Sequence, residues 1–140
     1  MQLIKKAIKE YELPFPSIAV GDVGTSIYEC RQGKYRKHSG WSRIISRDWR
    51  GKTGKDIHII IGGIRELTPQ EKEKQNTFKQ SYYIDPEKIT DGLIKKIEAR
   101  LKKGGITSQV VSSIDQTQSI GFIDIVPKSA DKKHALQYLE

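Results

Sequence analysis

The clearest candidate for catalytic chemistry in the sequence is Asp22, which follows a hydrophobic stretch in "IAVGDVGTSIY". A carboxylate that follows a buried strand can attack a phosphoryl group as a nucleophile. That chemistry needs a second carboxylate two residues later, in the pattern D-x-D-x-T, to protonate the leaving oxygen. Gly24 occupies that position. We therefore expect a structural turn at Asp22 rather than a nucleophile.

Side chains that could bind a transition metal are few and isolated. His38, His58 and His134 have no histidine or cysteine partner three or four residues further on, and Cys30 is the only cysteine. A zinc site needs several such ligands at close spacing. The sequence also has no P-loop and no G-x-S-x-G pattern. The residues themselves therefore predict no metal site.

The segment "QNTFKQSYY", residues 75–83, combines amides, hydroxyls and a lysine with three aromatic side chains. Its alternation predicts a strand over residues 77–84, because successive side chains of a strand point to opposite faces. The mainly apolar face carries Phe78, Gln80, Tyr82 and Ile84. The polar face carries Thr77, Lys79, Ser81 and Tyr83. This polar face is either ordinary solvent-exposed surface or a wall that holds a polar ligand.

The composition is that of a globular protein. The 140 residues are 36% hydrophobic and 30% charged, which suits one folded domain with a core. No apolar run approaches the roughly 20 residues that span a bilayer. Residues 1–13 lack the continuous apolar stretch of a signal peptide. With a single cysteine, we expect a cytoplasmic protein with no disulfide framework and no membrane partner.

The net charge of +8 allows two interpretations. Basic proteins often bind nucleic acid or phosphate compounds. The lysines are scattered along the chain, however, and no block of five or more like charges occurs. The charges therefore lie either on solvated helix faces or, at one or two lysines, in an anion-binding site.

Four stretches have the periodicity or the caps of helices. They are residues 2–11, residues 41–49, residues 85–103 and a last helix capped by Asp131. Asp85 and Pro86 suit the start of the third helix, and Gly104 suits its end.

Short strands are expected between these helices. They are residues 17–23, 25–30, 77–84, 107–113 and 122–126, with a polar loop over 31–40. For residues 56–64, "DIHIIIGGI", both a strand and a helix are possible. The isoleucines favour a strand, whereas the following glycines suit the end of a short helix. The fold class is α+β (α/β), an open, mostly antiparallel sheet with helices on one face.

Five segments taken together resemble the sucrose-phosphate phosphatase family of the haloacid dehalogenase superfamily. They are "DVGTSIY", "GWSRIISRDW", "QNTFKQSYYIDPE", "EARLKKGGI" and "FIDIVPKSADKKHALQYL". The resemblance runs from about residue 16 to about residue 139 and implies a type C2 cap that closes over a Rossmann-like core. We expect one domain over residues 1–140, with a cap-like α/β unit at about 30–126 and flanking core-type segments at 1–29 and 127–140.

The resemblance also implies the residues of a site. The substrate-binding residues would be Gln75, Asn76, Lys79 and Ser81. Lys132 would match the lysine that steadies the phosphate and the aspartyl nucleophile, whereas Lys133 stands where the family usually has glycine. The implied partners are a sugar phosphate, such as sucrose 6-phosphate, and the rest of the parent enzyme core. The intact family uses Mg²⁺, and we expect no cofactor for this chain alone.

The sequence departs from the family pattern at other positions too. The D-x-D-x-T motif and the later acidic motif for magnesium are absent, and Lys74 stands where the family commonly has glutamate. We therefore expect a catalytically incomplete cap with core segments. Its parent is either a sucrose-phosphate phosphatase or a sucrose-phosphate synthase, which carries a similar domain.

Two other functions fit the same residues. The charge and the tyrosines would suit a basic module that binds RNA or another polyanion, although only Tyr83 is expected on the open sheet face. A purely structural or regulatory domain that has lost ligand binding is the third hypothesis.

Overall fold

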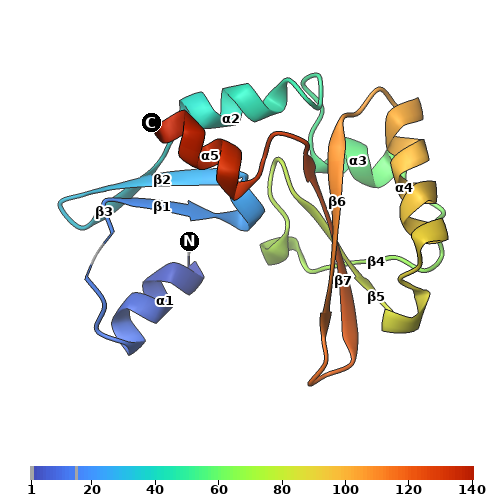
Figure 1. The fold of residues 1–140 in the computed structure, drawn as a ribbon, viewed down its shortest axis with the longest axis horizontal. Coiled ribbons are helices and arrows are strands. Elements are labelled where there is room, and N and C mark those ends of the chain that lie inside the picture. Colours follow the sequence, from blue (N-terminus) through green and yellow to red (C-terminus); the bar gives the residue numbers. More distant parts are fainter. Residues whose placement is uncertain (1, 15) are drawn as a thin grey trace. The chain divides into compact units, whose positions relative to one another are not determined.

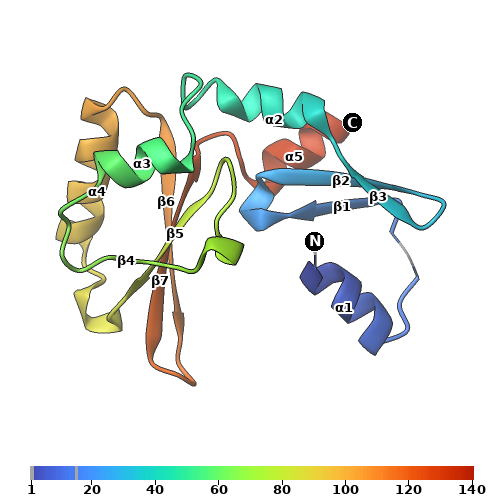
Figure 2. The ribbon, with the colours of Figure 1, turned by 180° about the vertical axis from the view of Figure 1, so that it is seen from behind.

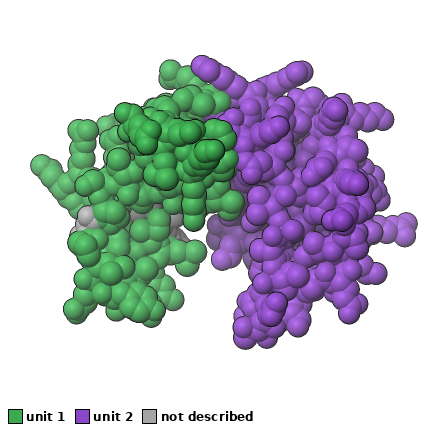
Figure 3. All heavy atoms as spheres, viewed as in Figure 1, with its two compact units in different colours: residues 1–44, 130–140 green, residues 45–129 purple. Residues whose placement is uncertain are grey.

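The computed structural model describes residues 2–14 and 16–140. The chain divides into two compact units, which Figure 3 colours separately. The first comprises Met1–Ile44 with Ala130–Glu140, and the second comprises Ile45–Ser129. None of the helices in the described residues is both long and apolar enough to cross a membrane. The expected cap boundaries near residues 30 and 126 stay a prediction.

The first unit contains a three-stranded antiparallel sheet of order β1-β2-β3. Its strands are β1 (Ile18–Gly21), β2 (Ser26–Arg31) and β3 (Lys34–Lys37). Its helices include α1 (Gln2–Glu10), the 3-10 helix η1 (Asp22–Gly24) and α5 (Lys132–Leu139). The cap of α5 is confirmed, because Asp131 Oδ1 accepts a hydrogen bond from the His134 backbone N–H at 2.7 Å.

The expected polar loop over residues 31–40 is wrong in part, because it contains β3. Gln32 and Gly33 have φ angles of 52° and 72°, as in a two-residue hairpin turn. Arg31 then pairs with Lys34 across the turn. The charged side chains of this edge strand hide the hydrophobic alternation that usually marks a strand.

Helix α2 (Ser39–Ser46) is shorter than the predicted helical stretch over residues 41–49. Trp49 follows it in a turn, yet the side chains of Trp41 and Trp49 are both buried. Trp41 Nε1 donates to the Gly24 carbonyl at 2.9 Å, and Trp49 Nε1 donates to Ser108 Oγ at 2.9 Å. Each buried indole therefore has a hydrogen-bond partner within its own unit.

The second unit contains an antiparallel four-stranded sheet of order β4-β5-β7-β6. Its strands are β4 (Thr68–Pro69), β5 (Gln80–Ile84), β6 (Ser108–Asp115) and β7 (Ile120–Pro127). Figures 1 and 2 show helices α3 (Gly54–Ile60) and α4 (Asp91–Lys103) on the same side of this sheet. The predicted α+β class, with an antiparallel sheet and helices on one face, is confirmed.

The open choice between strand and helix for residues 56–64 is settled by α3, which covers most of them. The backbone N–H of Thr53 donates to Asp56 Oδ2 at 2.8 Å, as in a capping box. Ile57 and Ile61 follow one turn apart and are both buried. The cap and this spacing outweigh the preference of isoleucine for strands.

The expected start of the long helix at Asp85 is wrong. Asp85 Oδ1 accepts from the Glu87 N–H at 3.1 Å and begins only the 3-10 helix η3 (Pro86–Lys88). Helix α4 begins at Asp91, where Thr90 Oγ1 accepts from the Leu93 N–H at 3.2 Å. Two capping residues compete in this stretch, and the second begins the long helix.

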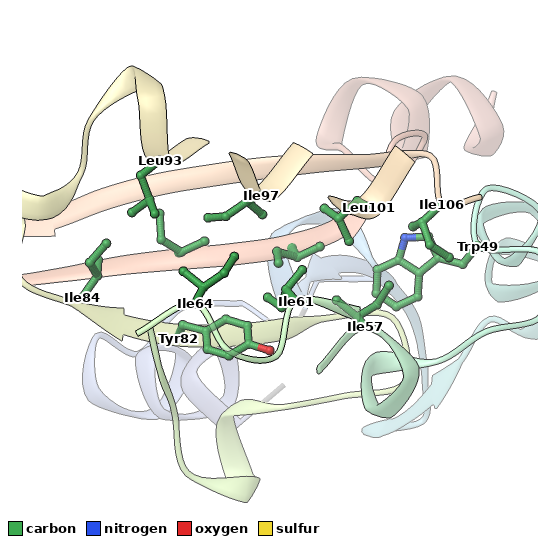
Figure 4. Packing of buried hydrophobic residues seen from close by; sticks show 12 residues of the cluster. Trp49, Ile57, Ile61, Ile64, Tyr82, Ile84, Leu93, Ile97, Leu101 and Ile106 are labelled. Atoms are coloured by element: carbon green, nitrogen blue, oxygen red, sulfur yellow. The ribbon is translucent and has the colours of Figure 1, made fainter. Parts of the chain in front are cut away.

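The core of the second unit lies between the two helices and the sheet (Figure 4). Its buried members are Trp49, Ile57, Ile61, Ile64, Tyr82, Ile84, Leu93, Ile97, Leu101, Ile106, Ile123 and Ile125. The prediction that Tyr82 and Ile84 point toward the helices is confirmed. Phe78 packs against the same cluster, with its ring centroid 5.9 Å from that of Trp49.

Candidate functional site

The second unit has a cavity of about 960 Å³ beside the start of α3, which we call the α3 cavity. The start of α3 and parts of residues 69–80 form its wall. Its polar lining includes Lys55, His58, Gln70, Gln75, Asn76 and Gln80. Amide groups both donate and accept hydrogen bonds, and lysine adds positive charge. The cavity therefore suits a ligand that has several hydroxyl groups and a negative charge.

Gln75 acts as an additional edge partner for β5. Its Oε1 accepts from the Ser81 backbone N–H at 2.7 Å, and its Nε2 donates to the Ser81 carbonyl at 2.8 Å. Nε2 also donates to the Gln70 carbonyl at 3.1 Å. A side-chain amide has two protons and two acceptor positions, so both protons of Gln75 are in use. Gln75 can therefore offer a ligand only the second acceptor position of Oε1.

Asn76 and Lys79 close the turn that precedes β5. Asn76 Oδ1 accepts from the Phe78 N–H at 2.9 Å, and the backbones of Asn76 and Lys79 form an isolated antiparallel bridge. Because β5 begins at Gln80, the predicted strand over residues 77–84 begins too early, and Lys79 is not part of its polar face. Asn76 lines the α3 cavity, whereas Lys79 lies half-buried on the turn.

Ser81 is buried, with 1% of its surface exposed. Its hydroxyl donates to Asp124 Oδ1, which belongs to its register partner in β7. Gln75 covers its backbone at the strand edge. Ser81 lies on the sheet face opposite to the helices, as its alternation with Tyr82 predicts. The expectation that it is uncovered there is wrong, because the side chains of Asp124 and Gln75 enclose it. The proposed contact between Ser81 and a substrate stays a prediction.

His58 and Tyr82 join the α3 cavity to the core. The Tyr82 hydroxyl lies 3.1 Å from His58 Nδ1, and the two rings stack with centroids 6.1 Å apart. Tyr82 is buried, whereas His58 is exposed and lines the cavity. Burial raises the pKa of Tyr82 to about 12, because the phenolate would lose its hydration. Tyr82 is uncharged at neutral pH and lies in the core behind His58, outside the lining of the cavity.

We expect the difference between the phenolate absorbance titrations of the wild type and Tyr82→Phe to show an ionisation near pH 12. The subtraction isolates Tyr82 from the other tyrosines. The pKa of Tyr82 in the folded chain is raised above the ordinary value of 10.0. The neutral phenol therefore contributes its full share of the free energy of unfolding below pH 10, and this share is lost as the pH rises toward 12. Circular dichroism at each pH checks that the chain stays folded. An ionisation near pH 10 in the folded chain would contradict the burial of this hydroxyl.

Lys132 and Lys133 lie in the other unit, in the first turn of α5, and both are exposed. The role of Lys132 in steadying a phosphate stays a prediction. Within residues 2–14 and 16–140, no three His, Cys, Asp or Glu side chains are placed to share a metal ion. The described residues therefore offer Mg²⁺ no cluster of three such ligands.

The sequence patterns considered above did not predict that α3 lines the cavity. Lys55 and His58 belong to this helix, and the pattern Thr53-x-x-Asp56 is a recognisable helix start. Gln70 and Gln80 also line the cavity but have no local signal. Their positions depend on the pairing of β4 with β5, which sequence periodicity does not give.

The sequence of this chain is similar to those of known phosphatases and hydrolases. The family model for sucrose-6F-phosphate phosphohydrolase matches residues 1–140. A HAD-like hydrolase of Nitrosococcus oceani is 42% identical over 98% of this chain and 37% of its own length. Sucrose-phosphatase 2 of Nicotiana tabacum is 27% identical over 98% of this chain and 30% of its own length. The chain therefore spans about a third of the length of these relatives.

A solved structure resembles the chain over nearly its full length. It is the X-ray structure of the sucrose-phosphatase of Synechocystis in complex with sucrose and phosphate. The TM-score is 0.78 at 27% sequence identity, and the match covers 99% of this chain and 51% of that one. The similarity includes the described parts of both units.

Proposed function

Because this chain belongs to the sucrose-6F-phosphate phosphohydrolase family of HAD-like hydrolases, we propose that it recognises a sugar phosphate such as sucrose 6-phosphate. The α3 cavity carries this proposal, since its amides and cations suit the hydroxyl and phosphate groups of such a ligand. The complex of the similar sucrose-phosphatase with sucrose and phosphate supports this class of ligand.

In this proposal, different parts of the chain bind the sugar and the phosphate. The cap-like unit, with boundaries near residues 30 and 126, binds the sugar, and the flanking segments belong to a core-type part. Asn76 and Lys79 contact sugar hydroxyls, while Gln75 and Ser81 hold β5 in place and leave one acceptor position on Gln75 for the ligand. Lys132 steadies the phosphate in an intact enzyme, where bound Mg²⁺ would neutralise phosphate charge.

The 140 residues contain no D-x-D-x-T pattern. A cap can hold a substrate and exclude water, but the phosphorus–oxygen bond breaks only with a nucleophile and an acid. We therefore propose that the chain by itself binds the sugar phosphate without hydrolysing it, in the cytoplasm. The nucleophile and the magnesium ligands then come from the core of a phosphatase or of a sucrose-phosphate synthase.

Adding sucrose 6-phosphate to the ¹⁵N-labelled chain should shift the amide resonances of residues 53–58 and 75–80. We expect a Kd in the millimolar range, which is about −4 kcal/mol, because one cavity encloses only part of the ligand. Asn76→Ala should weaken binding about tenfold, as expected for one lost hydrogen-bonding group. Gln118→Ala removes an exposed amide from the β6–β7 turn and should leave the affinity unchanged.

Phosphate release is measured in the same samples with Mg²⁺ added, and we expect none. Hydrolysis at rates typical of whole enzymes would contradict the proposal that the chemistry is incomplete. If saturating sucrose 6-phosphate shifts no resonance of the α3 cavity, sugar-phosphate recognition is refuted.

A module that binds RNA or another polyanion is the second candidate, and the net charge of +8 favours it. The open face of the four-stranded sheet nevertheless carries the carboxylates of Glu71 and Asp124 close to β5. These carboxylates repel nucleic-acid phosphates. Steeply salt-dependent RNA binding that Lys79→Ala abolishes would favour this candidate over the first.

A further inference from the structure

Strand β6 forms one edge of the four-stranded sheet, because the strand order is β4-β5-β7-β6. The Lys128 backbone N–H donates to the Thr107 carbonyl at 3.2 Å, so the carbonyl of Thr107 faces β7. In an antiparallel sheet, the backbone groups of successive residues point alternately to the two sides of the strand. The residues of β6 whose N–H and C=O groups point away from β7 are therefore Ser108, Val110, Ser112 and Ile114. Within residues 2–14 and 16–140, the backbones of these residues make no hydrogen bond to a loop or helix.

β6 lacks the features that usually prevent an edge strand from pairing with another chain, such as lysine, proline or a covering side chain. The edge strand β3 of the first unit reads "KYRK" and is largely cationic. On the other edge of the four-stranded sheet, β4 is short and contains Pro69, and Gln75 binds the backbone of β5. β6 has eight residues without lysine or proline, and its one charged side chain, Asp115, lies at its end. Since residues 112–114 are also exposed, β6 presents an open edge for strand pairing.

A second copy of the chain fits this edge in an antiparallel register. When a two-fold axis passes beside Val111, Ser108 lies opposite Ile114 of the second copy, and Val110 lies opposite Ser112. All the N–H and C=O groups of β6 that point away from β7 then have a partner in the other copy. A shift by two residues leaves one of these residues unpaired in each copy, so the central register is favoured. No like charges meet, because the acidic residue of β6 lies beyond the paired residues.

The charges of α4 beside this edge are self-complementary. Arg100 donates to the Gly62 carbonyl at 2.6 Å, so this flank of α4 faces the end of α3. The opposite flank has helical spacing and carries Asp91, Glu98 and Lys102, all exposed. The two-fold axis runs the α4 helices of the two copies antiparallel. The acidic start of each flank therefore faces the basic end of the other, which favours a second copy over an unrelated strand.

We propose that β6 is an association edge through which two copies of this chain pair, so that their four-stranded sheets join into one. The α3 cavity is lined by Pro69 of β4 and Gln80 of β5, at the other edge of the sheet. Association through β6 therefore leaves the cavity open. The proposal does not depend on the proposed function, and pairing and sugar-phosphate binding can be measured separately.

Amide hydrogen exchange of the full chain at different concentrations tests the pairing residue by residue. Pairing of one strand edge is a small interface, so we expect a Kd on the order of 10 μM. Raising the chain from about 1 μM to about 1 mM should slow exchange at Val110, Ser112 and Ile114 at least tenfold. The amides of Val111 and Ser113 point toward β7 and should change little, which makes them internal controls. Sedimentation equilibrium should show the mass doubling over the same range.

A charge placed on the edge should prevent the pairing. Ser112→Lys puts a lysine at an exposed edge position and should weaken association at least tenfold, because edge lysines disfavour strand pairing. Gln118→Lys adds the same charge in the exposed β6–β7 turn and is the matched control, with unchanged association.

Disulfide cross-linking tests the register. In a Cys30→Ser background, which removes the chain's only cysteine, mild oxidation should link two copies of Val111→Cys. The two-fold axis makes residue 111 a non-hydrogen-bonded pair with Cα atoms about 4.5 Å apart, which a disulfide can span. Ser113→Cys is the matched control, because its two copies lie roughly 13 Å apart along the strands and should not cross-link.

Several results would overturn the proposal. A chain that keeps a single mass at about 1 mM, with unchanged exchange at the three edge amides, does not pair through β6. If the chain doubles its mass but Ser112→Lys associates normally and Val111→Cys does not cross-link, another surface forms the dimer. If these amides slow only when a synthetic peptide of alternating valine and threonine is added, the edge accepts a foreign strand and the second copy is refuted. Should Ser112→Lys fail to fold, the exchange pattern of the wild type still decides the outcome.

Discussion

Replacing Ile97 with alanine is expected to lower the free energy of unfolding of the second unit by about 2–5 kcal/mol. Ile97 lies in the middle of α4, is fully buried and belongs to the core between the helices and the sheet. The substitution loses the transfer free energy of the removed atoms and leaves a cavity that close-packed neighbours fill only in part. Such a loss is a large share of the about 5–15 kcal/mol that stabilises a typical domain.

The fluorescence of Trp49 during denaturant unfolding measures this loss, because Trp49 packs in the same core. A Trp41→Phe background removes the chain's other tryptophan, which lies in the first unit. Lys96→Ala changes the exposed neighbouring position of the same helix and should alter stability by less than about 0.5 kcal/mol. Equal effects of Ile97→Ala and Lys96→Ala would show that α4 does not bury the face described above.

The elements predicted correctly are those whose signal lies within one short stretch. Leu93, Ile97 and Leu101 repeat at helical spacing, and all three are buried in α4. Asp131 is an isolated capping signal, and it accepts the expected backbone hydrogen bond at the start of α5. The contact that each of these patterns specifies lies within one helix or at its end, so periodicity and capping rules are sufficient.

The errors, and the choice left open for residues 56–64, arose where the local signals compete or are weak. Asp85 and Thr90 are both good caps, and only the packing of α4 against the core selects the second. The isoleucines of α3 favour a strand, whereas the cap at Thr53 favours a helix. In β3 the turn at Gln32 and Gly33 is the real signal, but the flanking residues are too polar to show a strand pattern.

The candidate site was harder to predict than the fold because its hydrogen bonds join residues that are distant in sequence. The Ser81 hydroxyl meets Asp124, 43 positions later, and the Tyr83 hydroxyl meets Glu71, 12 positions earlier. Both contacts depend on the order β4-β5-β7-β6, which alternation within a single strand cannot give. The composition of residues 75–83 indicates a polar site, but it does not indicate which polar groups are already used inside the fold.

Gln75→Leu is therefore expected to lower the free energy of unfolding of the second unit by about 1–3 kcal/mol. Strand β4 covers only Thr68 and Pro69, so Gln75 supplies the partner of the Ser81 N–H on this edge of β5. The Ser81 carbonyl keeps one hydrogen bond, from the Gln70 backbone N–H at 2.9 Å, whereas the N–H loses the acceptor at 2.7 Å. A buried donor without an acceptor costs more than the net worth of the bond that it replaces.

Amide hydrogen exchange at Ser81 measures this effect directly, and denaturant unfolding followed by Trp49 measures its cost. Exchange at Ser81 should become at least tenfold faster in Gln75→Leu, while Gln118→Leu, at an exposed amide, should change neither quantity. A residue that only touches the ligand would behave differently, because its removal would weaken sugar binding without changing exchange or unfolding. Since both amide protons of Gln75 are bound within the unit, we expect the loss of stability without any ligand present. Any loss of affinity for the sugar would then follow from the displaced edge of β5. Gln75 is therefore expected to act on the site by positioning β5.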